Sequence, residues 1–263
     1  MNRLGRVFLV GAGPGDPELL TLKAMRLIGQ AEVVVHDRLV SAEVLGLAPA
    51  SARRISVGKA PDRHPVPQDE INEMLVALAR QGQTVVRLKG GDPYIFGRGA
   101  EEIECLKAAG IPYELVPGIT AAQGCSAATG VPLTHRGLAT GVRYVTGHCR
   151  ADLPLDLDWA GLADLETTLV VYMGAASIAE IASKLIAHGM PADLPVLAIN
   201  NGTTPSERRL LTRLDDVAGL ARDAAFSGPV LFIIGRVVSL YEECPGAVLV
   251  RIAADLSREV VHA

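Results

Sequence analysis

Aromatic residues and cysteines are scarce in this chain: aromatics make up 4% of its 263 residues, and there are four cysteines. Cys105, Cys125, Cys149 and Cys244 are far apart, and no two of them form a C-x-x-C pair. This spacing argues against the usual zinc sites and disulfide frameworks, so we expect no metal. Reduced, buried thiols are typical of a cytoplasmic protein, which is the location we expect.

Long apolar runs are missing as well. No stretch of about 18 apolar residues is present, as a membrane-spanning helix would need, so we expect no membrane partner. The apolar run that begins after Arg6 is short and ends in glycine and proline. It therefore indicates a first strand rather than a signal peptide.

An excess of positive charge is also absent. The formal net charge is −4 and the sequence pI is about 5.9, values that argue against a nucleic-acid partner. One stretch departs from this balance, because residues 131–150 contain Arg136, Arg143 and Arg150 but no carboxylate. This local basic patch stands out in an acidic protein.

What the sequence does contain is a regular alternation of apolar, β-branched runs with segments of helical period. The alternation predicts largely parallel sheets covered by helices, and the length suits two such α/β lobes. We expect an N-terminal lobe at 1–134, a C-terminal lobe at 135–245 and a tail at 246–263. The expected strands are 6–10, 32–36, 53–57, 84–88, 112–116, 142–146, 168–172, 195–199 and 229–234. The expected helices are 17–29, 38–47, 68–80, 98–109, 119–129, 176–188 and 214–224.

The glycine-rich loop "VGAGPGDPELLTLKA" follows the first expected strand. Gly11 and Gly13 fit the dinucleotide fingerprint G-x-G-x-x-G, but Asp16 stands where the third glycine should be. Asp16, Pro17 and Glu18 form a strong helix start, in which the protein's own carboxylates occupy the position of a phosphate. No lysine follows as a phosphate-binding P-loop requires. We therefore expect a loop that approaches a ligand closely but rejects phosphate.

A second loop echoes the first, since "GPGDPELL" and "KGGDPYIF" both place Gly-Asp-Pro after a strand. The carboxyl ends of parallel strands share one edge of a sheet, where ligands of open α/β sheets bind. Asp37 and Lys59 follow the next two strands at that edge, and Arg98 lies at a helix start, where a cation is favoured only beside an anionic ligand. The simpler alternatives are a helix N-cap for Asp37 and a solvated loop position for Lys59. His135 is interpreted as structural.

In this order and spacing, "GAGPGDPELLTLKA", "VVHDRLVS", "VGK", "RLKGGDPYIFGRGAEE", "VPGITAA", "PLTHRG", "VTGH" and "VVYMG" closely resemble the uroporphyrinogen-III C-methyltransferases of the tetrapyrrole methylase family. The resemblance covers about residues 5–243. It implies two α/β lobes with a cofactor cleft between them, the tetrapyrrole methylase fold, and a homodimer. The chain departs from the commoner pattern at His36, where tyrosine is expected, and at Ala100, where glycine is frequent.

The resemblance also implies roles for individual residues. Asp37 and Lys59 match the proposed proton acceptor and donor, and the residues that match positions facing the tetrapyrrole are Arg98, Glu101 and Arg136. The residues that match cofactor contacts are Pro14, Gly90, Gly91, Asp92, Ile95, Thr120, Ala121, Met173 and Gly202.

The activity implied is S-adenosylmethionine-dependent methylation of uroporphyrinogen III at C2 and C7, giving precorrin-2 through precorrin-1 and leaving S-adenosylhomocysteine. A sulfonium cofactor without phosphate agrees with a loop that rejects phosphate. Arginines suit a substrate with eight carboxylates, because a guanidinium pairs a carboxylate through two parallel N–H bonds. Two alternatives stay open: a sibling methyltransferase that acts on a later precorrin, and a non-catalytic nucleotide-binding protein.

Overall fold

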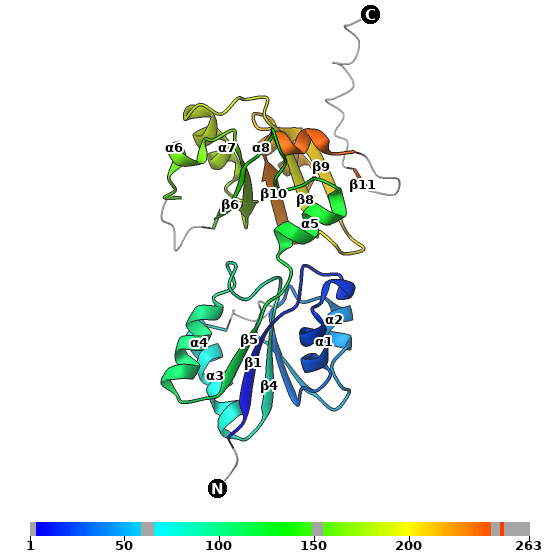
Figure 1. The fold of residues 1–263 in the computed structure, drawn as a ribbon, viewed down its shortest axis with the longest axis vertical. Helices are drawn as coiled ribbons and strands as arrows, with labels where there is room; N and C mark the ends of the chain where they lie inside the picture. The colour runs from blue at the N-terminus through cyan, green and yellow to red at the C-terminus, as the bar shows by residue number, and fades with distance from the viewer. Residues whose placement is uncertain (1–3, 59–65, 149–154, 243–247, 250–263) are drawn as a thin grey trace, which may run out of the picture. The chain divides into compact units, whose positions relative to one another are not determined.

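The computed structural model describes residues 4–58, 66–148, 155–242 and 248–249. The chain forms two compact units, unit 1 (Met1–Gly124) and unit 2 (Cys125–Ala263), each built on its own sheet with helices (Figure 1). The expected class, two α/β lobes, is confirmed. The units divide inside α5 (Ala121–Thr129), earlier in the chain than the boundary after residue 134 suggested by the sequence.

Unit 1 is built on a five-stranded sheet in which all neighbouring strands run parallel. Its strands are β1 (Arg6–Gly11), β2 (Val33–His36), β3 (Arg53–Ser56), β4 (Thr84–Lys89) and β5 (Tyr113–Val116), in the order β3-β2-β4-β1-β5. Strands β1 and β4 are almost wholly buried, as expected for parallel strands covered on both faces. The edge strand β3 exposes Arg53 and Arg54, charges that discourage pairing with another sheet.

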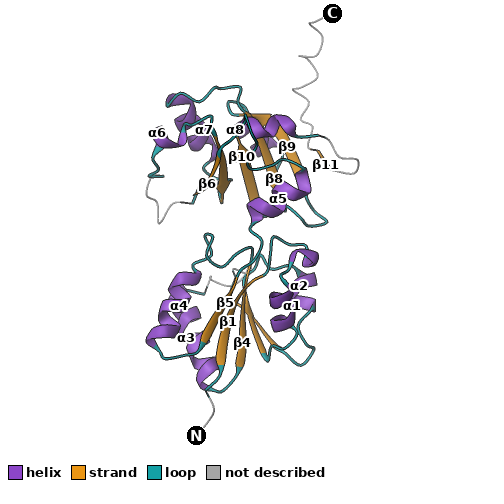
Figure 2. Cartoon of the chain, in the orientation of Figure 1, coloured by secondary structure: helices purple, strands orange, loops and turns teal. Residues whose placement is uncertain are grey.

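Helices cover both faces of this sheet: α1 (Leu22–Ile28) and α2 (Ala42–Gly46) on one, α3 (Gln68–Arg80) and α4 (Gly99–Ala108) on the other (Figures 1 and 2). Side chains that alternate along a strand point to opposite faces. Val10 of β1 accordingly packs in a core with Ile28 of α1. Leu9 packs in the opposite core with Leu106 of α4.

The first helical segment is split, although the sequence predicts one helix over 17–29. Asp16 caps the 3-10 helix η1 (Pro17–Leu19), because its Oδ1 accepts from the backbone N–H of Glu18 at 2.8 Å. The chain is then extended until Thr21, whose side chain caps α1. A second N-cap residue so close to the first restarts the helix in a new direction.

The second helix is also shorter than predicted, since α2 begins at Ala42 rather than at residue 38. Ser41 is its N-cap and accepts from the backbone N–H of Val44 at 3.3 Å. Residues 37–40 form a turn. Asp37 is therefore not the cap of this helix.

Unit 2 is built on a six-stranded mixed sheet. Its strands are β6 (Gly141–Thr146), β7 (Thr167–Tyr172), β8 (Pro195–Asn200), β9 (Arg208–Arg213), β10 (Val230–Ile234) and β11 (Val248–Leu249), in the order β11-β9-β8-β10-β7-β6. The expectation of a largely parallel sheet is wrong here, because β10 is antiparallel to β7 and β8, and β8 is antiparallel to β9. The sequence does not predict β9, since Arg208, Arg209 and Arg213 interrupt its apolar pattern.

Helices α6 (Trp159–Leu162), α7 (Ile178–Ala187) and α8 (Val217–Asp223) pack on one face of this sheet, around Phe232 of β10. A 3-10 helix, η2 (Arg236–Leu240), follows β10.

The second half of α5 belongs to unit 2 and contains Cys125. Cys125 is buried, and burial raises the pKa of its thiol to about 12. Of the helices in the described ranges, none is long and apolar enough to cross a membrane.

Candidate active site

The carboxyl edge of the unit 1 sheet gathers the loops that follow β1, β2, β4 and β5, because all these strands run in one direction. Strands β1 and β4 are neighbours, yet the chain leaves β1 for α1 on one face and β4 for α4 on the other. Ligands of open α/β sheets bind at such switch points. Most of the predicted site residues lie around this one.

A glycine pair joins the loops after β1 and β4. The N–H of Gly13 donates to the carbonyl of Gly91 at 3.2 Å, and the N–H of Gly91 donates to the carbonyl of Gly13 at 2.7 Å. Both residues have positive φ, +70° and +66°, which glycine adopts without strain. Pro14 and Gly90 adjoin this bridge, so two predicted cofactor contacts lie together.

The loop after β5 is tied to the same place through Asp92. Its Oδ2 accepts from the N–H of Gly118 at 3.0 Å, and its Oδ1 accepts from the N–H of Tyr94 at 2.8 Å. Gly118 also packs against the bridge, where a Cβ would lie 2.2 Å from the carbonyl oxygen of Gly91. Asp92 and Asp16 thus make the same bond, because each carboxylate accepts from the backbone N–H of the residue two positions later. This shared bond explains why the Gly-Asp-Pro sequence occurs in both loops.

The loop after β2 completes the edge. The hydroxyl of Ser41 donates to the carbonyl of Gly15 at 2.8 Å, which joins this loop to the loop after β1. A Cβ on Gly90 would lie 3.2 Å from Cβ of Leu39, so the loop after β2 also contacts the loop after β4.

Large apolar side chains remain exposed at this edge. Leu39 is 53% exposed, Tyr94 54% and Phe96 39%. Residues of this size contribute most to stability when buried. Their exposure in loops at one edge of the sheet indicates a surface for a large, partly apolar ligand. The predicted contact Ile95 is half-buried among them.

Arg98 and Glu101 form an exposed pair at the start of α4. Arg98 Nε donates to Glu101 Oε1 at 2.8 Å, and Nη2 donates to Oε2 at 2.6 Å. The hydrogen bond that Arg98 donates to Glu101 raises the pKa of Arg98 above its ordinary value. Arg98 also has φ +58°, a left-handed conformation that costs a non-glycine residue on the order of 1–2 kcal/mol. The backbone thus holds an exposed guanidinium at this edge at some energetic cost.

Asp37 is joined to buried charges that the sequence analysis missed. Arg87 Nη2 donates to Asp37 Oδ1 at 2.5 Å, and Lys89 Nζ lies 3.8 Å from Asp37 Oδ2. Both cations also contact Oε1 of the fully buried Glu102, at 3.1 Å from Arg87 and 2.8 Å from Lys89. Desolvation, with repulsion from Arg87, lowers the pKa of Lys89.

The strand pattern explains how these charges meet. Arg87 and Lys89 are two residues apart on β4, so they point to the same face as Val85. That face is covered by α4, which carries Glu102. The spacing of Arg87 and Lys89 within an apolar run was the available sequence signal, because buried charges are rare unless paired.

Thr120 and Ala121 lie at the start of α5. Thr120 Oγ1 accepts from the N–H of Gln123 at 3.2 Å, and Gln123 Oε1 accepts from the N–H of Thr120 at 3.2 Å. This is a capping box, in which two backbone donors at a helix start are satisfied. The side chain of Thr120 therefore has a structural role, and Ala121 presents only a small surface.

In unit 2, Met173 directly follows β7, and Gly202 lies two residues after the end of β8. Both strands are antiparallel to β10, which lies between them, so their carboxyl ends share one edge of this sheet. Met173 is 50% exposed. Its φ is +53°, and those of Asn201 and Thr203 beside Gly202 are +50° and +63°. Left-handed non-glycine residues cluster at functional sites.

Gly202 has a packing role as well. A Cβ at this position would lie 2.3 Å from Sγ of Cys125 and 3.2 Å from Cγ2 of Ile199. The loop after β8 is therefore packed tightly against the end of α5. Nearby, Arg209 Nη2 donates to the carbonyl of Ala128 at 2.7 Å, which holds the end of α5 to β9.

Arg136 lies elsewhere in unit 2. It is exposed in a turn in which the N–H of Ala139 donates to the carbonyl of His135 at 2.9 Å, just before the start of β6. Arg236, after the end of β10, donates to the carbonyl of Leu138 at 3.1 Å. The turn therefore lies at the opposite edge of the unit 2 sheet from Met173. The structure does not bring Arg136 together with Met173 and Gly202 within this unit.

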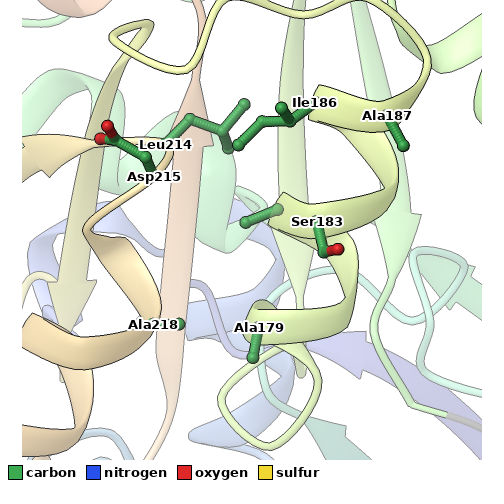
Figure 3. A pocket seen from close by; sticks show the side chains of 8 residues that line it. Ala179, Ser183, Ile186, Ala187, Leu214, Asp215 and Ala218 are labelled. Carbon is green, nitrogen blue, oxygen red and sulfur yellow. The ribbon is translucent and has the colours of Figure 1, made fainter.

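Lys59, the proposed proton donor, lies outside the described residues. Among the residues that are described, no group of three or more His, Cys, Asp or Glu side chains is placed to hold a metal ion. A separate hollow lies between α7 and α8 (Figure 3) and contains none of the predicted site residues. It is lined by Ala179, Ala182, Ser183, Ile186, Ala187, Leu214, Asp215 and Ala218.

The chain is similar to known proteins over most of its length. A uroporphyrinogen-III C-methyltransferase of Paracoccus denitrificans (strain Pd 1222) is 62% identical over 241 residues, covering 92% of this chain and 84% of that protein. A siroheme synthase of Acinetobacter baylyi (strain ATCC 33305 / BD413 / ADP1) is 53% identical over 239 residues, 91% of this chain but 52% of that protein. The chain thus spans about half the length of that relative.

A solved structure gives the same match in three dimensions. The uroporphyrin-III C-methyl transferase from Thermus thermophilus, complexed with S-adenyl homocysteine, shares 45% sequence identity with a TM-score of 0.78. The match covers 90% of this chain and 100% of that one. The family model of the Tetrapyrrole (Corrin/Porphyrin) Methylases matches residues 6–218. The chain belongs to the tetrapyrrole methylases.

Proposed function

We propose that this protein uses S-adenosylmethionine to methylate uroporphyrinogen III at C2 and C7, giving precorrin-2 through precorrin-1. Its family and its 62% identity to a uroporphyrinogen-III C-methyltransferase support this activity. The observation that carries the proposal is the carboxyl edge of unit 1. There a glycine bridge, exposed apolar side chains, Asp37 and the exposed Arg98 share one edge of the sheet.

The residues at this edge fit S-adenosylmethionine. The helical turn after β1 already has Asp16 at its N-terminus, so a phosphate there would meet a carboxylate. The tight glycine bridge lets a ligand approach the backbone, and the exposed apolar side chains suit an adenosyl group. We propose that Pro14, Gly90, Gly91 and Ile95 contact this cofactor, and that Met173, Gly202, Thr120 and Ala121 contribute from their own loops. Asp92 shapes the loop through its two backbone bonds.

The same residues suggest how the substrate is held. Uroporphyrinogen III carries eight carboxylates, and Arg98 presents a guanidinium that is more than half exposed. A substrate carboxylate can replace Glu101 on this fork, with Glu101 orienting the guanidinium until the substrate arrives. Bound S-adenosylmethionine would supply an electrophilic methyl group, and the electron-rich pyrrole carbon needs mainly to be placed in line with it.

Asp37 is our candidate for the base that accepts the proton which the methylated ring must lose. Its side chain is one-third exposed, and its Oδ1 is already bonded to Arg87, so the carboxylate is fixed while remaining open to a ligand. A positioned base of this kind contributes on the order of 10²–10⁴-fold to a rate. Lys59 remains our proposed proton donor, although it lies outside the described residues.

We further propose a homodimer in which Arg136 serves the site of a second copy. Strands β6 and β7 are paired in parallel, with Arg136 before the start of β6 and Met173 after the end of β7. The two residues are therefore separated by the length of one six-residue strand, which is about 20 Å. An arginine at that far edge is poorly placed for a ligand that Met173 of the same chain contacts. We also propose a cytoplasmic location, and that the precorrin-2 formed here feeds the synthesis of cobalamin, sirohaem or haem d1.

The proposed activity is tested by incubating the protein with uroporphyrinogen III and methyl-labelled S-adenosylmethionine, then counting transferred methyl groups by mass spectrometry. Two methyl groups per macrocycle and an equal yield of S-adenosylhomocysteine are expected. Methylation of a later precorrin but not of uroporphyrinogen III would establish the sibling activity instead. Cofactor binding without transfer to any of these tetrapyrroles would favour a binding protein.

A further inference from the structure

Three charged side chains are buried next to Asp37. Arg87 is 1% exposed, Lys89 2% and Glu102 0%. Burying charge is costly, and an apolar core of similar volume is often as stable. The cluster is therefore poorly explained by stability alone.

The geometry of Arg87 is the central feature. Its Nε donates to Glu102 Oε1 at 3.1 Å, while its Nη2 donates to Asp37 Oδ1 at 2.5 Å. Its Nη1 donates to the carbonyl of Leu88 at 3.3 Å. The guanidinium is thus fixed on three sides, and its planar fork joins a wholly buried carboxylate to one at the surface.

Glu102 is itself fixed from several directions. Its Oε1 also accepts from Lys89 Nζ at 2.8 Å and from Gln68 Nε2 of α3 at 3.3 Å. Helices α3 and α4 and strand β4 therefore all contribute to holding Arg87. Asp37 itself lies in a turn and does not cap α2. Its own segment contacts its backbone carbonyl, which lies 3.1 Å from His36 Nδ1, and not its carboxylate.

We propose that Arg87 is a positioning residue: clamped by Glu102, its guanidinium holds the Asp37 carboxylate in the orientation in which it accepts the substrate proton. This role rests on the proposed function. Arg87 does not reach the ligand itself, since its side chain is 2% exposed. Without the clamp, Asp37 samples several side-chain rotamers, and only a fraction of molecules are ready to accept the proton. The turnover rate falls, whereas cofactor binding is unaffected.

The competing explanation is that Arg87 only neutralises Glu102. Formally, Arg87 and Lys89 carry two positive charges against two negative charges on Glu102 and Asp37. Arg87→Met alone leaves one buried negative charge in excess, so its effect would be ambiguous. The double variant Arg87→Met with Glu102→Gln removes one charge of each sign. It keeps the balance between Lys89 and Asp37 but lacks the clamp.

The experiment compares the wild-type protein, R87M/E102Q and R87K. Lysine keeps the charge but lacks the fork, so it cannot donate to both carboxylates as arginine does. R87K also serves if the double variant fails to fold, which thermal unfolding reports. Arg80→Met, at an exposed arginine of α3, is the matched control. The measurements are kcat and KM for uroporphyrinogen III methylation and the affinity for S-adenosylhomocysteine by calorimetry.

We expect kcat to fall on the order of tenfold to a hundredfold in R87M/E102Q and clearly in R87K, with KM and S-adenosylhomocysteine affinity within about twofold of wild type. A wild-type kcat in either variant would overturn the proposal. If R87M/E102Q is the variant with a wild-type kcat, the role of Arg87 is to balance the charge of Glu102. If the wild-type protein does not methylate uroporphyrinogen III, the proposed function itself fails. A crystal structure of R87M/E102Q then decides: a displaced Asp37 carboxylate supports the clamp, and an unmoved one overturns it.

Discussion

At the scale of single residues, Arg98 combines a strained backbone with an exposed, bidentate ion pair. An exposed pair of this kind contributes at most about 1 kcal/mol to stability, so it does not explain the strain. Backbone strain of this kind is typical of residues with a functional role. Holding a guanidinium ready for a substrate carboxylate is a role that accounts for both features.

Replacing Arg98 with alanine should therefore impair tetrapyrrole binding and spare the cofactor. We expect kcat/KM for uroporphyrinogen III to fall on the order of tenfold to a hundredfold, the equivalent of one charge-assisted hydrogen-bonded contact. S-adenosylhomocysteine affinity, measured by calorimetry, should stay unchanged. Arg98→Gly is the matched variant, because it removes the same side chain and relieves the positive φ. Unaltered kcat/KM in both variants would remove Arg98 from the substrate site.

Residue patterns predicted some of these roles and missed others. Asp16 caps a helical turn as expected, because an Asp-Pro-Glu start depends only on neighbouring residues. Asp37 was placed at the correct sheet edge, but its partners were not found. Arg87 and Glu102 are separated along the chain and meet only when α4 packs on β4.

At the scale of elements, α5 and the loop after β8 fit each other closely through Gly202 and Cys125. The loop carries Asn201 and Thr203 with positive φ, so its conformation is held by its surroundings rather than by local preference. The absence of a Cβ at residue 202 is what allows Cys125 to approach.

Gly202→Ala should consequently destabilise the protein by about 1–3 kcal/mol, as overpacking does in a filled core. Adding Cys125→Ala removes the Sγ atom that a Cβ would meet at 2.3 Å. We expect the double variant to regain part of the lost melting temperature, with Ile199 still limiting the fit. Thermal unfolding of the two single variants and the double variant measures this coupling. Additive effects would show that the two residues do not compete for the same space.

The elements themselves were predicted unevenly. The strands of unit 1 lie close to where the alternation places them, because parallel strands covered on both faces are continuously apolar. Strand β9 was missed, because its arginines hide the apolar pattern. Arg209 is buried in the structure, where it contacts Glu207 and the carbonyl of Ala128. With β9 missing, the antiparallel pairing of β8 with β9 could not be inferred.

At the scale of the whole molecule, the position of Arg136 at the far edge of the unit 2 sheet leads to a prediction about assembly. Chains carrying Arg136→Ala and chains carrying Asp37→Asn should each be nearly inactive alone. A mixed dimer should regain about half of the wild-type activity per dimer, because in the homodimer that we propose one of the two sites would combine Asp37 of one copy with Arg136 of the other. Co-expression with two affinity tags isolates the mixed species.

Two results would contradict this assembly. Mixed dimers as inactive as the parent variants would place Arg136 and Asp37 in the site of a single chain. Failure to isolate any mixed species, together with a monomeric mass in light scattering, would overturn the homodimer itself.

The sequence alone determined the class of two α/β lobes, the strands and caps that depend on neighbouring residues, and the family. It also indicated that the first glycine loop rejects phosphate, because this property depends on three adjacent residues, Asp16, Pro17 and Glu18. Only the tertiary structure decided that Gly13 and Gly91 form a bridge, that Asp37 rests on Arg87 and Glu102, and that Arg136 lies apart from Met173. Each of these depends on contacts between residues far apart in the chain, which form when strands pair and helices pack.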